Sequence, residues 1–450
     1  MKRVNIVIIC LILILSIIGC SNDSIKSVQK QGSGQIEIII MIDDYNYEYM
    51  NTTYKILENY SQRFEHEKET KVNFDIITAS NADDYYKKKN IKLYLNDGPT
   101  LIFISEYEPY KNYIEQGIAF DIKGKIPNLE KVYNVLFNDG SYFVPIGMSC
   151  WSTVLNRGSF EKLGIDEPNP YWTRDDYLKI KEKWLKLEPK YFTRFEYWEI
   201  LIPALNELDI LDEPNKKINL NSQEVIQLIK DIRQDVFSDK YILNEDYTYE
   251  NYYNMIFEKE SEEYKDSNYL EKYFDSKGLT PTYSGTSNGL KSLEVSNFID
   301  TNNDIVLPNV AYGENDLFGV WGFIVNRNGK NIELGMEFIN GLLKDDVQLE
   351  TFTQEYSSYP VNKEIENDIS KIEEEKSINE KAIDLRKYIL SQIETGNYRR
   401  SHSSKIKQEM QIMLHKDFAK YIFADEPYTD KELSDELQKL EDKYGVWIRE

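Results

Sequence analysis

The segment from Gly285 to Gly289 reads Gly-Thr-Ser-Asn-Gly, the G-x-S-x-G spacing that presents a serine nucleophile at a strand-to-helix turn. Such a serine also needs an acid and then a histidine later in the chain, because the histidine takes the proton of the hydroxyl. Only His402 and His415 follow Ser287, and neither lies in a loop-like stretch. A lone motif has low specificity, so a serine hydrolase remains only an alternative function.

Metal chemistry has still less support. The three histidines and three cysteines stand in no H-E-x-x-H or C-x-x-C pattern, so a zinc site lacks ligands. Asp300, Asn302 and Asp304 begin like a calcium loop, but Ile305 and Ala311 replace its required glycine and glutamate. We expect no metal and no cofactor. Carboxylates are so abundant that no pair indicates glycoside hydrolysis, which also stays an alternative.

The first third of the chain alternates apolar runs with helical periodicity. Residues 36–41, 71–78 and 101–104 are short, β-branched and apolar, which predicts buried strands. Residues 51–68 and 82–96 between them have the spacing of helices. This order predicts an α/β unit with a parallel sheet and right-handed crossovers. Ligands bind at the carboxyl ends of such strands, where Asp44 and Tyr45 follow the first one.

Residues 140–172 join this unit to a second one. They resemble the first inter-lobe crossing of family 1 extracellular solute-binding proteins, which serve ABC importers. The family has G-x-x-Y-x-x-P and then Y-N-x-x-x-F-x-x-x-G-[IL]-x-x-P-x-T-W. Matching positions are Tyr142, Pro145, Asn156, Phe160, Gly164, Ile165, Pro168 and Trp172. The chain departs from the pattern at Leu155, where an aromatic is commoner, and in having Trp172 before Thr173.

Two further segments carry the same resemblance. The family's P-D-[IV]-[IV]-x-x-x, followed by Y-x-x-x-G-x-[LI]-x-D-I, is matched by Pro99, Tyr113, Gly117, Phe120, Asp121 and Ile122, with Thr100 replacing the aspartate. The pattern G-x-W-G-x-x-[IV]-x-x-x-x-K-N-x-E-x-A-x-x-F-[IL] is matched by Gly319, Trp321, Gly322, Val325, Lys330, Asn331, Glu333, Phe338 and Ile339, with Gly335 in place of alanine. The resemblance covers about residues 36–362 and is weak over 190–280.

The resemblance implies the two-lobe periplasmic-binding-protein fold of type II, with mixed α/β sheets flanked by helices and three inter-lobe crossings. Lobe 1 is expected to comprise residues 36–145 and 305–344, and lobe 2 residues 146–298 and 350–450. The ligand cleft would lie between them. Gly147 to Trp151 is then a hinge as well as a cleft wall, and the other crossings are expected near 298–304 and 344–350.

The expected ligand contacts come from strand ends and from these crossings. In the family, contacts follow the third strand, which here implies Glu106 and Tyr107. The whole set of candidates is Asp44, Tyr45, Glu106, Tyr107, Trp151, Tyr283, Ser287 and Trp321. Trp151 and Trp321 are as well suited to filling a core, and Asp44 to capping a helix. With 34 tyrosines in the chain, any single tyrosine is weak evidence.

The N-terminus predicts export. Lys2 and Arg3 precede an apolar run from Ile6 to Ile18, which is shorter than the roughly 18 or more residues that span a bilayer. We expect residues 1–19 to be a lipoprotein signal peptide and 20–35 a lipid anchor and flexible tether; a membrane-anchor helix is the alternative. By resemblance to lipoproteins, Cys20 receives a diacylglyceryl group. Cys150 is then the only other cysteine of the mature chain, so no internal disulfide forms.

The formal net charge of −23 argues against nucleic acid as a partner, because phosphate binding needs clustered cations. The resemblance implies a monomer that is not an enzyme, held by lipid at the extracytoplasmic face of a cell membrane of Gram-positive type. Its partners would be a small solute, foremost a carbohydrate, and ABC permease subunits. A peptide, polyol or polyamine remains open as ligand, and a sensor or adhesin with the same fold remains an alternative function.

Overall fold

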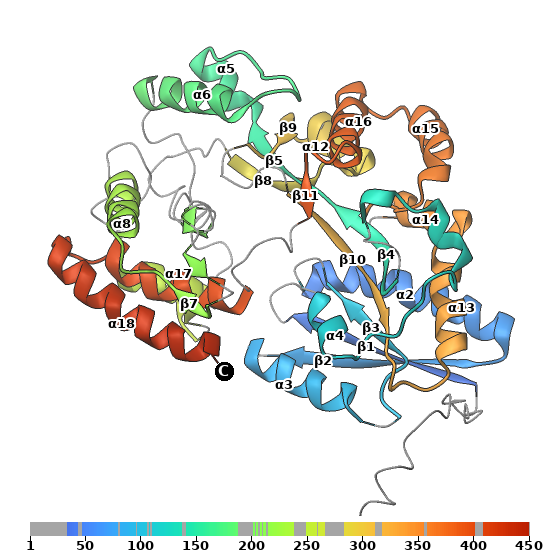
Figure 1. Ribbon diagram of the computed structural model, residues 1–450. Helices are drawn as coiled ribbons and strands as arrows, with labels where there is room; N and C mark the ends of the chain where they lie inside the picture. Colours follow the sequence, from blue (N-terminus) through green and yellow to red (C-terminus); the bar gives the residue numbers. More distant parts are fainter. Residues whose placement is uncertain are drawn as a thin grey trace, which may run out of the picture.

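The computed structural model describes residues 34–43, 47–79, 82–95, 97–105, 108, 110–136, 141–187, 201–202, 204–205, 208, 210–212, 215–237, 249–258, 260–265, 283–310, 317–354, 358–400 and 408–449. Their strands form a six-stranded, a three-stranded and a two-stranded sheet, with helices around them (Figure 1). None of the helices in this part of the chain is long and apolar enough to cross a membrane.

The six-stranded sheet begins with the three strands that the apolar runs predict. β1 (Gln35–Asp43) pairs in parallel with both β2 (Lys71–Ala79) and β3 (Leu101–Ile104). α2 (Tyr47–Lys68) and α3 (Ala82–Leu93) connect them. All four residues of β3 are buried, as expected of a central parallel strand. The predicted α/β unit is therefore confirmed.

Two later segments make this sheet mixed. β10 (Leu317–Val325) runs antiparallel to β3 on one side and to β4 (Phe143–Ser149) on the other. The short β11 (Arg399–Arg400) pairs in parallel with the start of β10. The β10–β4 register shifts between Trp321 and Gly322. A Cβ at Gly322 would run into the carbonyl oxygen of Val144, so this close strand approach requires glycine.

The chain enters the three-stranded sheet directly after β4. Only Cys150 separates β4 from β5 (Trp151–Asn156), which pairs antiparallel with β8 (Tyr283–Asn288) and β9 (Asp304–Pro308). The chain thus changes sheets inside the expected hinge. Because Ile305 to Leu307 pair with β5, the return to the larger sheet falls between Pro308 and Leu317, later than the expected 298–304.

The remaining elements cover these sheets or form a separate group. They are α4 (Lys111–Glu115), α5 (Arg157–Leu163), α6 (Arg174–Leu187), β6 (Leu211–Asp212), β7 (Lys217–Ile218), α8 (Gln223–Val236), α9 (Tyr249–Phe257), α10 (Glu262–Lys265), α12 (Ser292–Thr301), α13 (Ile332–Leu342), α14 (Asp345–Thr353), α15 (Glu366–Glu375), α16 (Glu380–Glu394), α17 (Gln408–Ile422) and α18 (Asp430–Arg449). The main apolar core runs from the larger sheet to α12 and α16. α8, α17 and α18 share a second core and lie together in Figure 1.

A buried ionic network ties α16 to its neighbours. Arg386 donates from Nε and Nη2 to the two carboxylate oxygens of Glu373, at 2.7 and 2.9 Å, and from Nη1 to Glu366, at 2.8 Å. The Tyr359 hydroxyl donates to Glu366, and the Ser292 hydroxyl to Glu373. Side chains from α12, α15, α16 and the segment at Tyr359 thus meet around one guanidinium.

The substitution Arg386→Met should lower the free energy of unfolding by about 3–5 kcal/mol, because it leaves the Glu373 carboxylate buried without its counter-ion. Urea unfolding measures this loss. The control is Lys381→Met on the same helix, whose exposed pair with Glu167 should contribute less than about 1 kcal/mol. Equal losses in the two variants would contradict a structural role of the network.

Candidate functional site

The ends of several strands meet where the two sheets join. β10 runs antiparallel to β3, so its first residues lie beyond the carboxyl end of β3, next to β11. β4 ends alongside them, with Ser149 opposite Gly319. β5 begins one residue later. In open α/β sheets ligands bind at the carboxyl edge, which makes this junction the candidate site.

Four of the ligand candidates follow β1 and β3 in the sequence. Asp44, Tyr45, Glu106 and Tyr107 lie outside the described residues, as does Cys20. Asp43 ends β1 and Ser105 follows β3, so each pair follows the carboxyl end of a strand of the larger sheet in the sequence. The backbone of Tyr283 pairs with Leu155, while its side chain is outside the described part. Their roles stay predictions.

Trp151 lies at the junction itself. It is the first residue of β5, opposite Asn288, and is partly exposed. The Asn288 side-chain oxygen accepts from the backbone N–H of Cys150 at 3.0 Å, and the Gly289 N–H donates to the Cys150 carbonyl at 2.8 Å. These bonds fix the turn after β8 against the crossing. The position of Trp151 suits ligand contact, which remains a prediction.

Ser287 is buried at the end of β8. Its hydroxyl donates to a carboxylate oxygen of Glu294 in α12, at 2.9 Å. Burial raises the pKa of Glu294, and the Ser287 and Lys291 side chains oppose that shift. His415 lies in α17, where its ring packs against Phe257 at 5.1 Å between centroids. The G-x-S-x-G motif thus presents its serine to a carboxylate of the adjoining helix.

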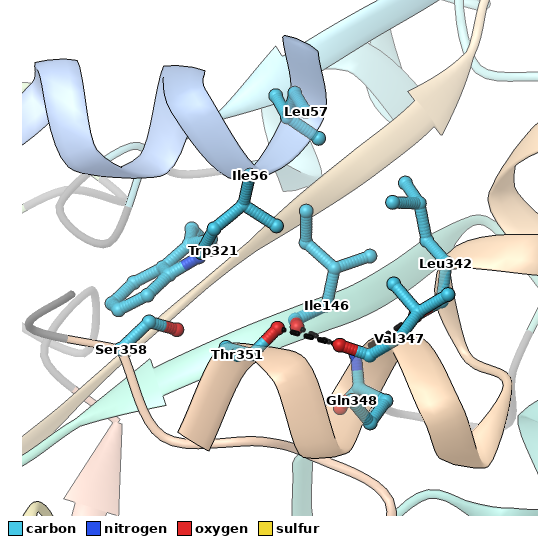
Figure 2. A pocket seen from close by; sticks show the side chains of 9 residues that line it. All are labelled: Ile56, Leu57, Ile146, Trp321, Leu342, Val347, Gln348, Thr351 and Ser358. Atoms are coloured by element: carbon cyan, nitrogen blue, oxygen red, sulfur yellow. Dashed lines mark hydrogen bonds between the residues drawn. The ribbon is translucent and has the colours of Figure 1, made fainter. Parts of the chain in front are cut away.

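Trp321 packs inside the main apolar core. Its side chain is 5% exposed and, as Figure 2 shows, lies beside Ile56 of α2, with Ile146 and Thr351 nearby. The hollow between these residues has a volume of about 10 Å³, which suffices for one water and not for a sugar. A Cβ at Gly147 would lie 2.5 Å from Trp321 Nε1. The packing alternative accounts for this tryptophan, and its ligand contact stays a prediction.

Sequence reasoning missed Lys291, which immediately precedes α12. Its buried Nζ donates to the carbonyl oxygens of Thr351, Phe352 and Gln354, at 3.1, 2.7 and 3.1 Å. These carbonyls form the C-terminal end of α14, which carries partial negative charge. One cation thus joins a helix beside the smaller sheet to a helix beside the larger one. A single lysine in an ordinary sequence context gives no signal of this.

A second missed feature lies just beyond β3. Glu108 is buried and accepts from Lys89 Nζ of α3 at 2.6 Å, while the Tyr113 hydroxyl donates to the same oxygen. The Glu108 N–H donates to the Ser105 carbonyl at 3.1 Å. A buried ion pair therefore fixes Glu108 shortly after β3, next in sequence to two candidate ligand residues. Burial lowers the pKa of Lys89, and the Glu108 carboxylate opposes this.

Metal ligands are not grouped at this junction. Within the described ranges, no three or more histidine, cysteine, aspartate or glutamate side chains come together so that they could hold a metal ion. Asp300, one of the residues that resembled a calcium loop, accepts hydrogen bonds from Ser296 and Asn379 instead. The arrangement offers aromatic, amide and hydroxyl groups, which suit noncovalent binding.

The sequence matches no protein-family model and no curated protein. Solved structures do match over most of the chain. An ABC substrate-binding protein from Listeria monocytogenes, in complex with cycloalternan, has 16% identity and a TM-score of 0.55, covering 92% of this chain and 98% of its own. An ABC transporter solute-binding protein from Thermotoga lettingae, bound with α-D-tagatose, has 14% identity and a TM-score of 0.56, covering 92% and 100%.

A solute-binding protein from Streptococcus pneumoniae, in complex with the blood group A trisaccharide, has 16% identity and a TM-score of 0.54, covering 91% and 100%. These matches establish the class of structure. The chain has the mixed α/β, two-lobe periplasmic-binding-protein fold that ABC-transporter solute-binding proteins share. The fold expected from the sequence is confirmed.

The buried position of Lys291 makes stability depend on pH. Burial lowers the pKa of Lys291 to about 7 from 10.5, although Glu294 opposes the shift. Between pH 7 and pH 10.5 this lysine is mostly protonated in the unfolded chain and mostly neutral in the folded one. The contribution of Lys291 therefore makes the folded protein more stable as pH rises from 7 to 10. Lys291→Met should abolish that contribution, which amounts to at most about 1.4 kcal/mol per pH unit.

Urea unfolding of both proteins at several pH values from 7 to 10 gives the comparison. The stability of wild type minus that of Lys291→Met should increase with pH. The exposed Lys387 of α16 provides a control, and Lys387→Met should leave the pH dependence of the wild type unchanged. A difference that is constant or falls with pH would contradict a lysine buried in this way.

Proposed function

We propose that the mature protein is a solute receptor of an ABC importer, which captures a small solute at the junction of the two sheets and delivers it to the permease subunits. The observation that carries the proposal is the crossing at Cys150, where strand ends from both sheets converge. This geometry occurs in a fold shared with ABC solute-binding proteins. The proposal makes the protein a binding protein and not an enzyme.

A sugar or oligosaccharide is the ligand we favour. The three similar structures named above hold cycloalternan, α-D-tagatose and the blood group A trisaccharide. An aromatic face such as that of Trp151 binds the apolar face of a sugar ring, while buried polar groups select its hydroxyls. Asp44, Tyr45, Glu106, Tyr107, Tyr283 and Ser287 are the further contacts we propose, with Trp321 as a contact if it leaves the core on binding.

Binding would proceed by closure of two lobes. We propose that they follow the divisions expected from the sequence, residues 36–145 with 305–344 and residues 146–298 with 350–450, with two changes. β9 moves to the second lobe because it pairs with β5, and β11 moves to the first because it pairs with β10. A ligand that contacts both lobes stabilises the closed state by its higher affinity for that state. The monomer suffices for this mechanism.

We also propose that the receptor is held at the extracytoplasmic face of the membrane by lipid on Cys20. The support is the sequence alone, namely the basic N-terminus, the apolar run and the Ile-Ile-Gly-Cys ending. Two acyl chains on one residue bind a membrane stably where a single chain does not. Residues 20–35 would serve as the tether.

Trp151→Ala should weaken sugar binding by at least about tenfold while leaving both sheets folded, because this residue is partly exposed at the junction. A thermal-shift screen of sugars, peptides and amines identifies the ligand, and calorimetry gives its affinity. The control is Tyr171→Ala, which removes a ring that is 67% exposed, and it should leave affinity unchanged.

Trp321→Ala separates packing from binding. Since this ring is buried, its removal should lower the free energy of unfolding by about 3–5 kcal/mol. Trp151→Ala should cost much less. The absence of any ligand with sub-millimolar affinity in all three chemical classes would refute the receptor function, and unchanged affinity in Trp151→Ala would place that residue outside the binding site.

A further inference from the structure

The end of α3 presents an apolar face to solvent. Ile91, Tyr94 and Leu95 are 67%, 56% and 54% exposed, although they are large apolar side chains. Ile91 lies in the last turn of α3, and Tyr94 and Leu95 directly follow its last residue, where the Leu95 N–H donates to the Lys92 carbonyl at 3.4 Å and continues the chain in a helix-like turn. Lys89 and Leu93 occupy the opposite side and are buried. Single exposed apolar residues are ordinary, whereas three large ones within five residues at the end of α3 indicate an interaction surface.

This face lies beside the point where the described chain begins. The Asn328 side chain donates to the carbonyl oxygen of Leu93 at 3.1 Å, and the Asn331 side chain donates to that of Gln35 at 2.7 Å. One short turn therefore binds both the end of α3 and the start of β1. The first described residues, from Gly34, therefore lie beside the apolar face, and residues 1–33 precede them in the sequence.

The charge around the face permits contact with lipid. Lys88 is exposed one turn before the apolar side chains. Lys92 forms an ion pair with Asp75, and Lys330 lies 3.8 Å from Asp97. The strongly negative charge of the rest of the chain is screened beyond about 8 Å at physiological ionic strength. Apolar and aromatic side chains bordered by lysine are typical of surfaces that bind the interface of a bilayer.

We propose that the α3 face, formed by Ile91, Tyr94 and Leu95, contacts the membrane surface when the chain is anchored at its N-terminus. This inference rests on the proposed anchor at Cys20. Residues 20–33 can extend over at most ~50 Å, so the tether keeps the face within reach of the bilayer. A tether of this kind turns a weak contact into a frequent one, because it sets a high effective concentration.

The proposed contact fixes an orientation. α3 ends near the amino ends of β1 and β3, whereas the proposed ligand site lies at their carboxyl ends. With the α3 face on the lipid, the ligand site would point away from the membrane and toward free solute. Delivery to a permease would then require release of the face and reorientation on the tether, for which three side chains form a suitably weak contact.

Hydroxyl-radical footprinting of tyrosines tests the contact. The lipidated full chain is placed on vesicles of phosphatidylcholine mixed with phosphatidylglycerol, and the Cys20→Ser chain in solution gives the reference. Oxidation of Tyr94 should slow by at least about threefold on vesicles, because a side chain at the bilayer interface loses access to solvent. Tyr171, which is 67% exposed in the connection between α5 and α6, should react equally in both samples.

A pair of variants controls for folding. Ile91→Ser with Leu95→Ser should restore rapid oxidation of Tyr94 on vesicles without lowering thermal stability, because both side chains are exposed. Leu178→Ser, an exposed leucine of α6, should leave the Tyr94 protection intact. Equal oxidation of Tyr94 on vesicles and in solution would overturn the proposal. Protection that appears without vesicles and grows with protein concentration would instead assign the face to a second copy.

A second attachment separates this inference from the lipid anchor. Residues 21–450 with an N-terminal hexahistidine are bound to vesicles that contain a nickel-chelating lipid. Protection of Tyr94 there supports the α3 face even if the natural chain proves to carry no lipid. Rapid oxidation of Tyr94 there overturns the α3 contact even if Cys20 is lipidated.

Discussion

The crossing at Cys150 is the constraint on which the arrangement depends. Since one residue separates β4 from β5, the pairing of β4 with β10 also fixes where β5 and its partners begin. Asn288 and Gly289 bond to both backbone groups of Cys150, so the end of β8 is held at the same point. Burial raises the pKa of the Cys150 thiol to about 12, which keeps it neutral in this apolar position.

Two buried basic side chains extend this constraint to the helices. Lys291 bonds to the C-terminal end of α14, and Arg386 joins α16 to two glutamates of α15. Polar and charged groups are costly to bury unpaired, so each of these side chains requires its hydrogen-bond partners to stay in place. The helices next to the crossing are therefore tied to the larger sheet. α8, α17 and α18 have their own apolar core, so the ties do not include them.

The elements that the sequence predicted correctly depend on local pattern. Short β-branched runs identified β1, β2 and β3, and the segment around Gly147 to Trp151 was recognised as the crossing. The sequence placed the second crossing near 298–304, but the composition of Ile305 to Leu307 does not say which sheet this run joins. Likewise, a tryptophan such as Trp321 suits a core as well as a binding site, so its type does not say which it occupies. Lys291 acquires its role only through carbonyl groups that are distant in the sequence. Such features depend on tertiary contacts that no local pattern contains.

The proposed receptor function requires that ligand binds where the two sheets meet. Hydrogen–deuterium exchange with and without the tightest-binding sugar tests it most directly. We expect the largest loss of exchange in peptides on both sides of Cys150, together with those that contain residues 105–108 and 287–291. Protection confined to one sheet, or to the outer surface of α2 around Gln62 and His66, would contradict a ligand site at the junction.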